Sequence, residues 1–558
     1  MNKKVLPLAV GAASAVVMSA AHAAMYINER GTGETLIFPF YSTQNSNATN
    51  INIANTTTGH KAVKVRVLEA ENSQEVIDFN LYLSPEDHFS FAISADADTG
   101  GATLVTRDNS CTVPAIPADG VALRNIKYSG DKRAVEDDPK TEADESKGNY
   151  DNTGIGRTQV GYIEVIEMGQ LDSDSAPIID KKGLADAKVT AINAAAAITH
   201  DADGMPANCG ILVDAWSTIK GVDGVWLAES KTTDKTGDSE FLASWAGGGL
   251  YGYASVINVN QGATFGYDAV AINDHVAVGA TGSDMHYEPG DIRPNFTDNA
   301  FDTASIVSVN GAAVTLDFDG DYDEGPVDRV QALNATIMSS EVYNDYVTDA
   351  DISATTDWLM MFPTKAFHVN GTEPIEPFSV LWNGQSACEQ TELSAVDREE
   401  STPPPPPSPG STGPDFSPAP PTPPGPAPKG DDVPLCYEAT IVQFANESAA
   451  GTPKDDGIAV GVGAYLDAAN GWATISLMPG DLDSTLGPCG IDGDITTKGD
   501  WTDPCDRSID AGDGQLFGLP VIGFAVQKYA NGGPGATYAM STEHKSCAAG
   551  SGTVANEC

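Results

Sequence analysis

The segment KAVKVRVL, residues 61–68, alternates apolar and basic side chains with a period of two. Its three valines fall on one side of an extended chain, and Lys64 and Arg66 fall on the other. Successive side chains of a β-strand point to opposite faces of the sheet, so this pattern predicts a strand with one apolar and one polar face. Such strands are typical of antiparallel sheets that pack on one side.

The same alternation continues outward from this segment. Residues 50–54, 76–83 and 88–93 also alternate, and clusters of Asn, Thr, Gly, Ser and Pro separate them. Strands at this spacing predict a mainly β protein built from one or more antiparallel β-sandwich domains. The other predicted strands are 159–166, 249–272, 313–318, 358–362, 437–444, 458–464, 471–478 and 520–527. We expect the strand at 358–362 to form a hairpin with residues 365–369.

A polar and helical insertion is predicted at about 112–208. Residues 112–158 are polar and acidic, whereas 184–199 is rich in alanine and has apolar side chains at helical spacing. A second short helix is predicted at 211–219. Cys111 and Cys209 would bracket this insertion.

The segment 401–434 is rich in proline, with five consecutive prolines at 403–407. Such a composition favours polyproline II and cannot form a core of its own. The segment is either a linker between domains or a loop within one domain. We therefore expect a β-sandwich region at 24–400 and a C-terminal β region at 435–558, which in the second case completes the same fold.

The first 23 residues have the pattern of a signal peptide. A basic start precedes an apolar run, 5–21, which ends in the small-residue motif Ala21-His22-Ala23. We expect cleavage after Ala23 and export to the extracellular space or the cell surface, with the periplasm as the alternative. No later stretch approaches the roughly 20 apolar residues of a membrane helix, so no membrane span is expected in the mature chain.

The chain is strongly acidic, with 78 Asp and Glu against 30 Lys and Arg and a formal net charge of −48. Such a charge repels nucleic acids and anionic membranes, so neither is an expected partner. Adaptation to a salty environment explains the excess, because salt screens repulsion between the carboxylates. A dedicated role in binding cations is the alternative.

The eight cysteines of an exported chain predict four disulfides. We expect sequential pairing, because it closes coherent loops, although other connectivities remain open. The absence of a C-x-x-C motif argues against a zinc ribbon and a redox motif. The predicted pairs are Cys111–Cys209, Cys388–Cys436, Cys489–Cys505 and Cys547–Cys558.

The strongest chemical signal is a run of acids around Gly320. Carboxylates alternate at Asp317, Asp319, Asp321 and Asp323, and a bend at Gly320 would turn their oxygens toward one Ca²⁺ ion. A solvated acidic turn is the alternative. The chain has no G-x-S-x-G, H-E-x-x-H or Walker motif, so no catalytic residue is predicted.

Several strand and turn motifs carry a resemblance to a known group. They are TLIFPFY at 35–41, the block at 63–85, the segment 356–365 and GLPVIGF at 518–524. With these motifs the chain resembles uncharacterised exported all-β surface proteins of Gram-negative bacteria. The resemblance implies a shared fold and location, and it transfers no activity.

These observations predict an exported structural or adhesive protein of the cell surface. It would be stabilised by disulfides and calcium, would not be an enzyme, and would associate with itself or with cell-surface components. An exported carbohydrate- or metal-binding module is the first alternative. An exported hydrolase with an unrecognised active site is the second.

Overall fold

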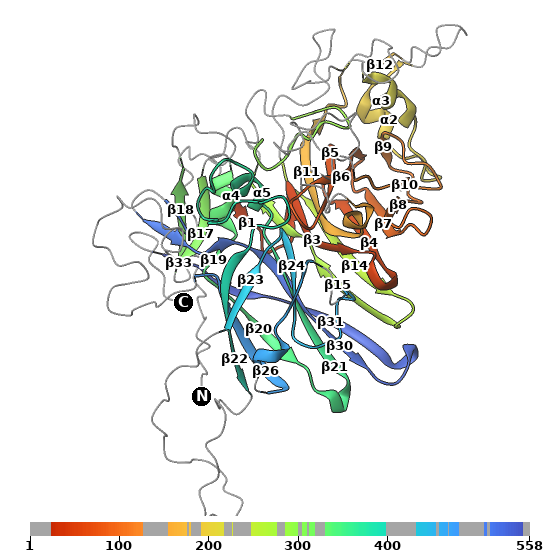
Figure 1. The fold of residues 1–558 in the computed structure, drawn as a ribbon. Helices are drawn as coiled ribbons and strands as arrows, with labels where there is room; N and C mark the ends of the chain where they lie inside the picture. The colour runs from red at the N-terminus through yellow and green to blue at the C-terminus, as the bar shows by residue number, and fades with distance from the viewer. Residues whose placement is uncertain are drawn as a thin grey trace, which may run out of the picture.

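The described residues form two mainly antiparallel β-sandwiches, which confirms the predicted fold class (Figure 1). The first sandwich comes from the N-terminal half of the chain and the second from the C-terminal half. The structure is a computed structural model. It describes residues 24–125, 154–175, 178–179, 191–216, 226, 247–275, 285–298, 304–309, 312–318, 330–397, 431–453, 457–466, 468–478, 507–510 and 514–550.

The first sandwich has an outer sheet, sheet 1, and an inner sheet, sheet 2. Sheet 1 has the order β10-β8-β7-β4-β14-β15, and β2 also pairs with β14. Its strands are β2 (Thr32–Gly33), β4 (Asn47–Asn55), β7 (His88–Ala95), β8 (Ala102–Val105), β10 (Val121–Ala122), β14 (Leu250–Asn258) and β15 (Ala263–Asp268).

Sheet 2 has the order β1-β16-β3-β11-β5-β6-β9. Its strands are β1 (Tyr26–Ile27), β3 (Thr35–Ser42), β5 (His60–Glu69), β6 (Glu75–Leu83), β9 (Cys111–Val113), β11 (Val160–Leu171) and β16 (Val270–Asn273). The predicted strand at 249–272 is thus three strands, and these complete the first sandwich as expected.

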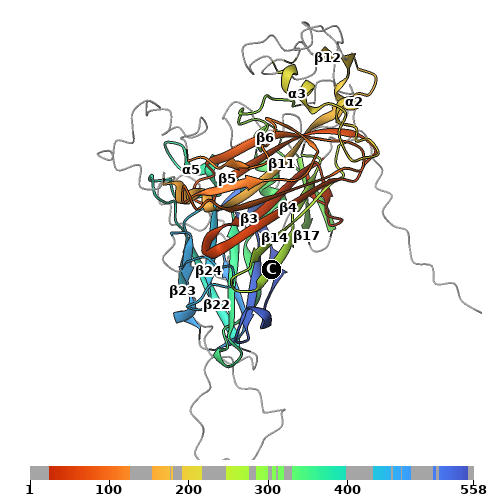
Figure 2. The same ribbon diagram turned by 90° about the vertical axis from the view of Figure 1, so that its right-hand side faces the viewer.

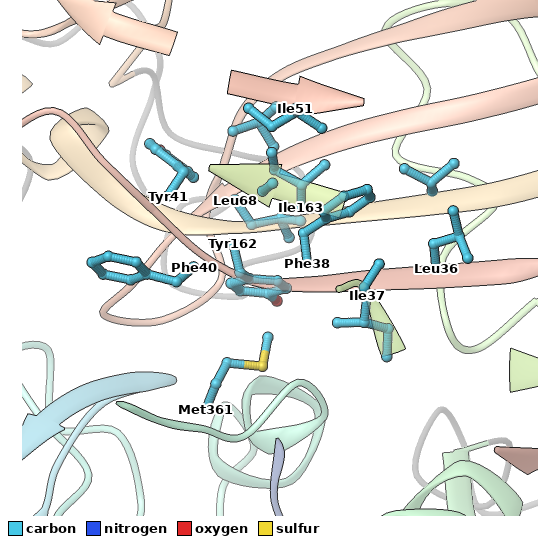
Figure 3. Packing of buried hydrophobic residues seen from close by; sticks show 14 of the residues in the cluster. Leu36, Ile37, Phe38, Phe40, Tyr41, Ile51, Leu68, Tyr162, Ile163 and Met361 are labelled. Atoms are coloured by element: carbon cyan, nitrogen blue, oxygen red, sulfur yellow. The ribbon is translucent and has the colours of Figure 1, made fainter. Parts of the chain in front are cut away.

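The core of the first sandwich lies between the inward faces of sheets 1 and 2. Phe38 and Ile163 of sheet 2 point toward Ile51 of sheet 1, and all three side chains are fully buried (Figure 3). The three valines of the 61–68 segment lie on the same face of sheet 2, as their alternation predicts. Burying a side chain of this kind contributes about 1.5–3 kcal/mol, so these aligned faces hold the two sheets together.

The second sandwich consists of sheets 3 and 4. Sheet 3 has the order β25-β24-β21-β30-β31, and sheet 4 has the order β23-β22-β26-β20-β32. The strands of sheet 3 are β21 (Ala354–Met361), β24 (Ala439–Gln443), β25 (Ala459–Gly461), β30 (Ile522–Ala530) and β31 (Thr537–Glu543). The strands of sheet 4 are β20 (Glu341–Val347), β22 (Glu389–Asp397), β23 (Asp431–Leu435), β26 (Asn470–Ser476) and β32 (Lys545–Cys547).

Sheet 3 is covered on both faces. Trp358 and Met360 of β21 pack into the core of the second sandwich, whereas Leu359 and Met361 pack toward sheet 2. In Figure 3, Met361 lies below Tyr162 and Ile37 of sheet 2. The continuous apolar run of β21 follows from this position, because a strand that is buried on both faces needs no polar side.

The outer face of sheet 2 is buried, which corrects the expectation of a sheet packed on one side. The polar side chains Lys64 and Arg66 are 0% and 7% exposed. The strands of the second sandwich cross this face, and Figure 2 shows them running across the direction of β5 and β11. The segment 285–298 covers another part, because the Nζ of Lys64 donates to the backbone oxygens of Glu288 (3.2 Å) and Asp291 (3.0 Å).

Three cations of β5 are buried with carboxylate partners, Lys64 and Arg66 on the outer face and Lys61 on the side of the valines. Lys61 pairs with Glu167, and Lys64 lies 2.8 Å from Asp78. Arg66 lies between two carboxylates. These are Glu75, at 2.7 Å from its Nε, and Glu164, at 2.5 Å from its Nη1. Pairing is required here, because an isolated charge in a buried position costs several kcal/mol.

The predicted insertion at 112–208 is interrupted by β11, a central strand of sheet 2. The helix expected at 184–199 is seen only as α2 (Ala194–Ile198), and β13 (Ala191–Ile192) precedes it, while 180–190 lie outside the described residues. Asn193 caps α2 by accepting a hydrogen bond from the N–H of Ala196 (2.8 Å), which explains why the helix begins late. The second predicted helix is α3 (Cys209–Ala215).

The hairpin expected at 365–369 is wrong, because these residues form the short helix α5 (Lys365–Val369). The true neighbours of β21 are β24 and β30. The described chain has further small helices and strands. They include α4 (Gln331–Thr336), β12 (Ile178–Ile179), β17 (Ala304–Val309), β18 (Ala312–Asp317), β19 (Met338–Ser339), β27 (Ser508–Asp510), β28 (Gln515–Phe517), β29 (Leu519–Pro520) and β33 (Ala549–Gly550).

The Pro-rich segment connects two neighbouring strands. It follows β22 and precedes β23, and these strands pair antiparallel within sheet 4. Residues 431–434 belong to β23, and 401–430 lie outside the described residues. Sheets 3 and 4 each contain strands from before and after this segment, so the C-terminal β region completes a sandwich that begins near residue 341.

Candidate functional site

The two sandwiches are joined by contacts of several kinds. The N–H of Ala439 donates to the backbone oxygen of Ala70 (2.9 Å), and the Nδ2 of Asn47 donates to that of Ala450 (2.8 Å). The ring of Tyr267 stacks on Phe524 with centroids 4.6 Å apart and an interplanar angle of 20°. Because both partners in each contact belong to strands or buried turns, the sandwiches hold each other in one orientation.

A cleft of about 890 Å³ opens beside this junction. Its walls come from four stretches of the chain, 27–31, 253–271, 336–342 and 521–546, and from Pro39 of β3. The first two belong to the edge of the first sandwich, and the last two belong to the second. The volume lies within the range of about 300–1,000 Å³ that is typical of ligand pockets.

The floor of the cleft is apolar and its rim is polar. Tyr267 and Phe524 form the floor with their stacked rings, and the hydroxyl of Tyr267 donates to the backbone oxygen of Phe40. Exposed carboxylates of Glu29, Asp268 and Glu543 line the rim. No Lys or Arg is found among the described lining residues, so the cleft disfavours anionic ligands.

His544 is the one imidazole among the described lining residues, and both of its ring nitrogens are used. The Nδ2 of Asn344 donates to its Nδ1 (3.1 Å), so the proton is on Nε2, which donates to the backbone oxygen of Leu359 (3.0 Å). Burial lowers the pKa of His544 to about 4, so the ring is neutral near pH 7. Through these two hydrogen bonds the ring connects β20 and β21 to the turn between β31 and β32.

The predicted calcium site falls mostly outside the described residues. Asp317 is the last residue of β18, and Asp319, Asp321 and Asp323 are not described. Within the described part of the chain, no group of three or more His, Cys, Asp or Glu side chains is arranged to hold a metal ion. Calcium binding at 317–323 stays a prediction.

Two of the four predicted disulfides are confirmed. Cys111 is bonded to Cys209 and ties β9 to α3, and Cys388 is bonded to Cys436 at the base of β22 and β23. Cys547 is also disulfide-bonded, and its predicted partner Cys558 lies outside the described residues, as do Cys489 and Cys505.

We expect all eight cysteines to be paired in the native protein. Thiol titration of the denatured, unreduced protein should find no reactive thiol, and the same titration after reduction should find eight. Two or more thiols before reduction would contradict the four-bridge arrangement. A single thiol would leave seven bonded cysteines, which requires a disulfide to another molecule.

The cleft residues carry no local signal in the sequence. Glu29 follows β1 and Glu543 ends β31, more than 500 positions apart, and neither belongs to a motif. Only the packing of the two sandwiches brings them to one opening. Tyr253 and Asp268 are equally unremarkable as residues of predicted strands, although they face each other across β14 and β15.

Comparison with known proteins adds no relative. No family model, no curated protein and no solved structure matches the chain. The resemblance to exported surface proteins therefore stays a prediction. Across the described residues, no helix has the length and apolar character that a membrane-crossing helix needs.

Proposed function

We propose that the protein is an exported adhesive protein of the cell surface, and that it holds its partner in the cleft between the two sandwiches. The observation that carries this proposal is the cleft itself, about 890 Å³ in volume, with walls made of strands from two sandwiches in fixed contact. A pre-formed opening loses little entropy when it binds, which favours recognition. The two observed disulfides suit an oxidising compartment.

The imidazole among the described lining residues is not free to act as an acid or a base. General acid–base catalysis needs a side chain that is free to exchange a proton with the substrate. His544 is held at both nitrogens by the protein. The rim carboxylates remain as hydrogen-bond acceptors, and with no cationic side chain among the described lining residues they favour an uncharged or positively charged partner.

The proposal is tested on intact cells. Antibody labelling without permeabilisation should detect the protein, and a deletion strain should attach less to surfaces than the wild type. Complementation with Ser546→Trp, which places a large ring in the cleft lining, should fail to restore attachment. The matched control is Ser394→Trp on β22, away from the cleft. A protein found only inside the cell, or full attachment by the deletion strain, would contradict the proposal.

A further inference from the structure

The outer face of sheet 1 is turned away from the sandwich core. It consists of the even positions of 48–54, 88–94 and 264–268 and the odd positions of 103–105 and 251–257. The residues between them, such as Ile51, Phe89 and Val256, lie in the core. The register brings one outward side chain from each strand into rows, for example Ser90, Asn52, Tyr253 and Asp268.

This face is almost free of charge. Its outward positions carry Ala, Gly, Val, Ile, Ser, Thr, Asn and Tyr together with His88, and Asp268 is the single acid among them. At the chain's average of 78 acids in 558 residues, these outward positions would carry about two acids, and they carry one. The low β-propensity of acidic residues does not by itself explain the single acid on this face, because the outer face of sheet 4 carries Glu341, Asp345 and Glu392.

Two tyrosines form an aromatic ridge on this face. Tyr251 and Tyr253 are neighbours on the outward side of β14, with ring centroids 5.9 Å apart and planes inclined at 37°. Tyr251 is 36% exposed, and Tyr253 also lines the cleft. The ridge therefore continues the cleft onto the open face of the sheet.

Hydrogen-bonding groups flank the ridge. Asn52 and Asp268 are the direct neighbours of Tyr253 on the two adjacent strands. The Nδ2 of Asn52 is buried and has no partner among the described residues, although buried amide groups are nearly always paired. A donor in Asn52 and an acceptor in Asp268 thus stand on either side of one aromatic ring.

We propose that the outer face of sheet 1 binds an uncharged polysaccharide, which stacks on Tyr251 and Tyr253 and bonds through its hydroxyls to Asn52 and Asp268. The C–H groups of a sugar ring suit the negative face of an aromatic ring, and each hydroxyl can both donate and accept. The net charge of −48 repels anionic polysaccharides. The face carries no arginine or methionine, two of the residue types that are enriched at protein interfaces.

This inference rests on the proposed adhesive function and names the class of its partner. The test uses the full-length exported protein and three insoluble or immobilised probes, which are cellulose, chitin and amylose, with alginate as the anionic probe. The wild type should be retained by at least one neutral probe and not by alginate. Tyr251→Ala with Tyr253→Ala should weaken that retention at least tenfold without changing the melting temperature.

The matched control replaces two exposed aromatic residues of sheet 4, Tyr343→Ala with Trp472→Ala, and should bind as the wild type does. The proposal would be overturned if no neutral probe retained the wild type, or if both double variants lost retention equally. Neither result would contradict the adhesive function, which the attachment assay tests separately. The oligomeric state of the Tyr251/Tyr253 variant is measured by sedimentation. If it changes while polysaccharide retention does not, the face is instead a contact between copies of this chain.

Discussion

Replacing Arg66 with methionine is expected to lower the free energy of unfolding by about 3–5 kcal/mol. The guanidinium of Arg66 lies between Glu75 and Glu164, and all three side chains are nearly inaccessible to solvent. Methionine fills most of the volume but leaves two buried carboxylates without a cation. Urea titrations followed by far-UV circular dichroism at pH 7 would measure the loss.

The expected loss depends on pH. Burial raises the pKa of Glu164 to about 6, although Arg66 acts to lower it. A carboxyl with a higher pKa in the folded than in the unfolded chain costs stability as the pH rises, here from about 4.5 to about 6. Without Arg66 the folded pKa rises further, so the cost continues to grow above pH 6. The difference between wild type and variant should therefore be smallest near pH 4.5 and largest above neutrality.

Two controls separate the lost ion pair from a general effect of the substitution. Arg30→Met removes an exposed arginine and should change the free energy of unfolding by less than about 0.5 kcal/mol. Adding Glu75→Gln and Glu164→Gln to Arg66→Met removes the unpaired charges and should recover much of the stability. A loss in Arg66→Met that is the same at pH 4.5 and pH 8 would contradict the role assigned to these carboxylates.

Arg66 also marks the limit of what local sequence patterns can predict. The alternation at 61–68 correctly separates the core-facing valines from Lys64 and Arg66. It cannot tell whether the polar side meets water, because that depends on what packs against it. Here the backbone oxygens of Glu288 and Asp291, which accept from Lys64, belong to a segment more than 220 positions away in the chain.

The two errors in short elements have local causes. Asn193 is a good N-cap residue, and it marks the start of α2 more accurately than the alanine-rich composition that suggested a helix from residue 184. Residues 365–369 are too few for the apolar pattern to distinguish a strand from a helical turn.

The disulfides and the cleft differ in how far the sequence reveals them. Sequential pairing of cysteines predicts the two observed bridges, because each closes one excursion from a sheet. The cleft and the nearly uncharged face arise from strand register and from the packing of two sandwiches. Individual residues such as Tyr253 and Asp268 carry no sign of either until the register places them side by side.

Replacing Trp358 with alanine is expected to lower the free energy of unfolding by about 3–5 kcal/mol, because it opens a large cavity in the second sandwich. The indole is fully buried in the central strand of sheet 3. Its ring lies 4.9 Å from that of Phe444 and 5.2 Å from that of His544, and its Nε1 donates to the backbone oxygen of Asp345 (3.2 Å). The substitution removes both ring contacts and leaves that oxygen without this donor.

Trp472→Ala is the matched control, because this tryptophan lies on the outer face of sheet 4 and is 47% exposed. It should change the free energy of unfolding by less than about 0.5 kcal/mol. Leu359 and Met361 belong to β21, the strand of Trp358, and they pack on sheet 2. Loosening β21 should therefore also lower the unfolding midpoint of the first sandwich. Two results would contradict a core shared across the junction. One is a near-ultraviolet unfolding midpoint that falls in Trp358→Ala for the second sandwich alone. The other is a loss of unfolding free energy no larger than that of Trp472→Ala.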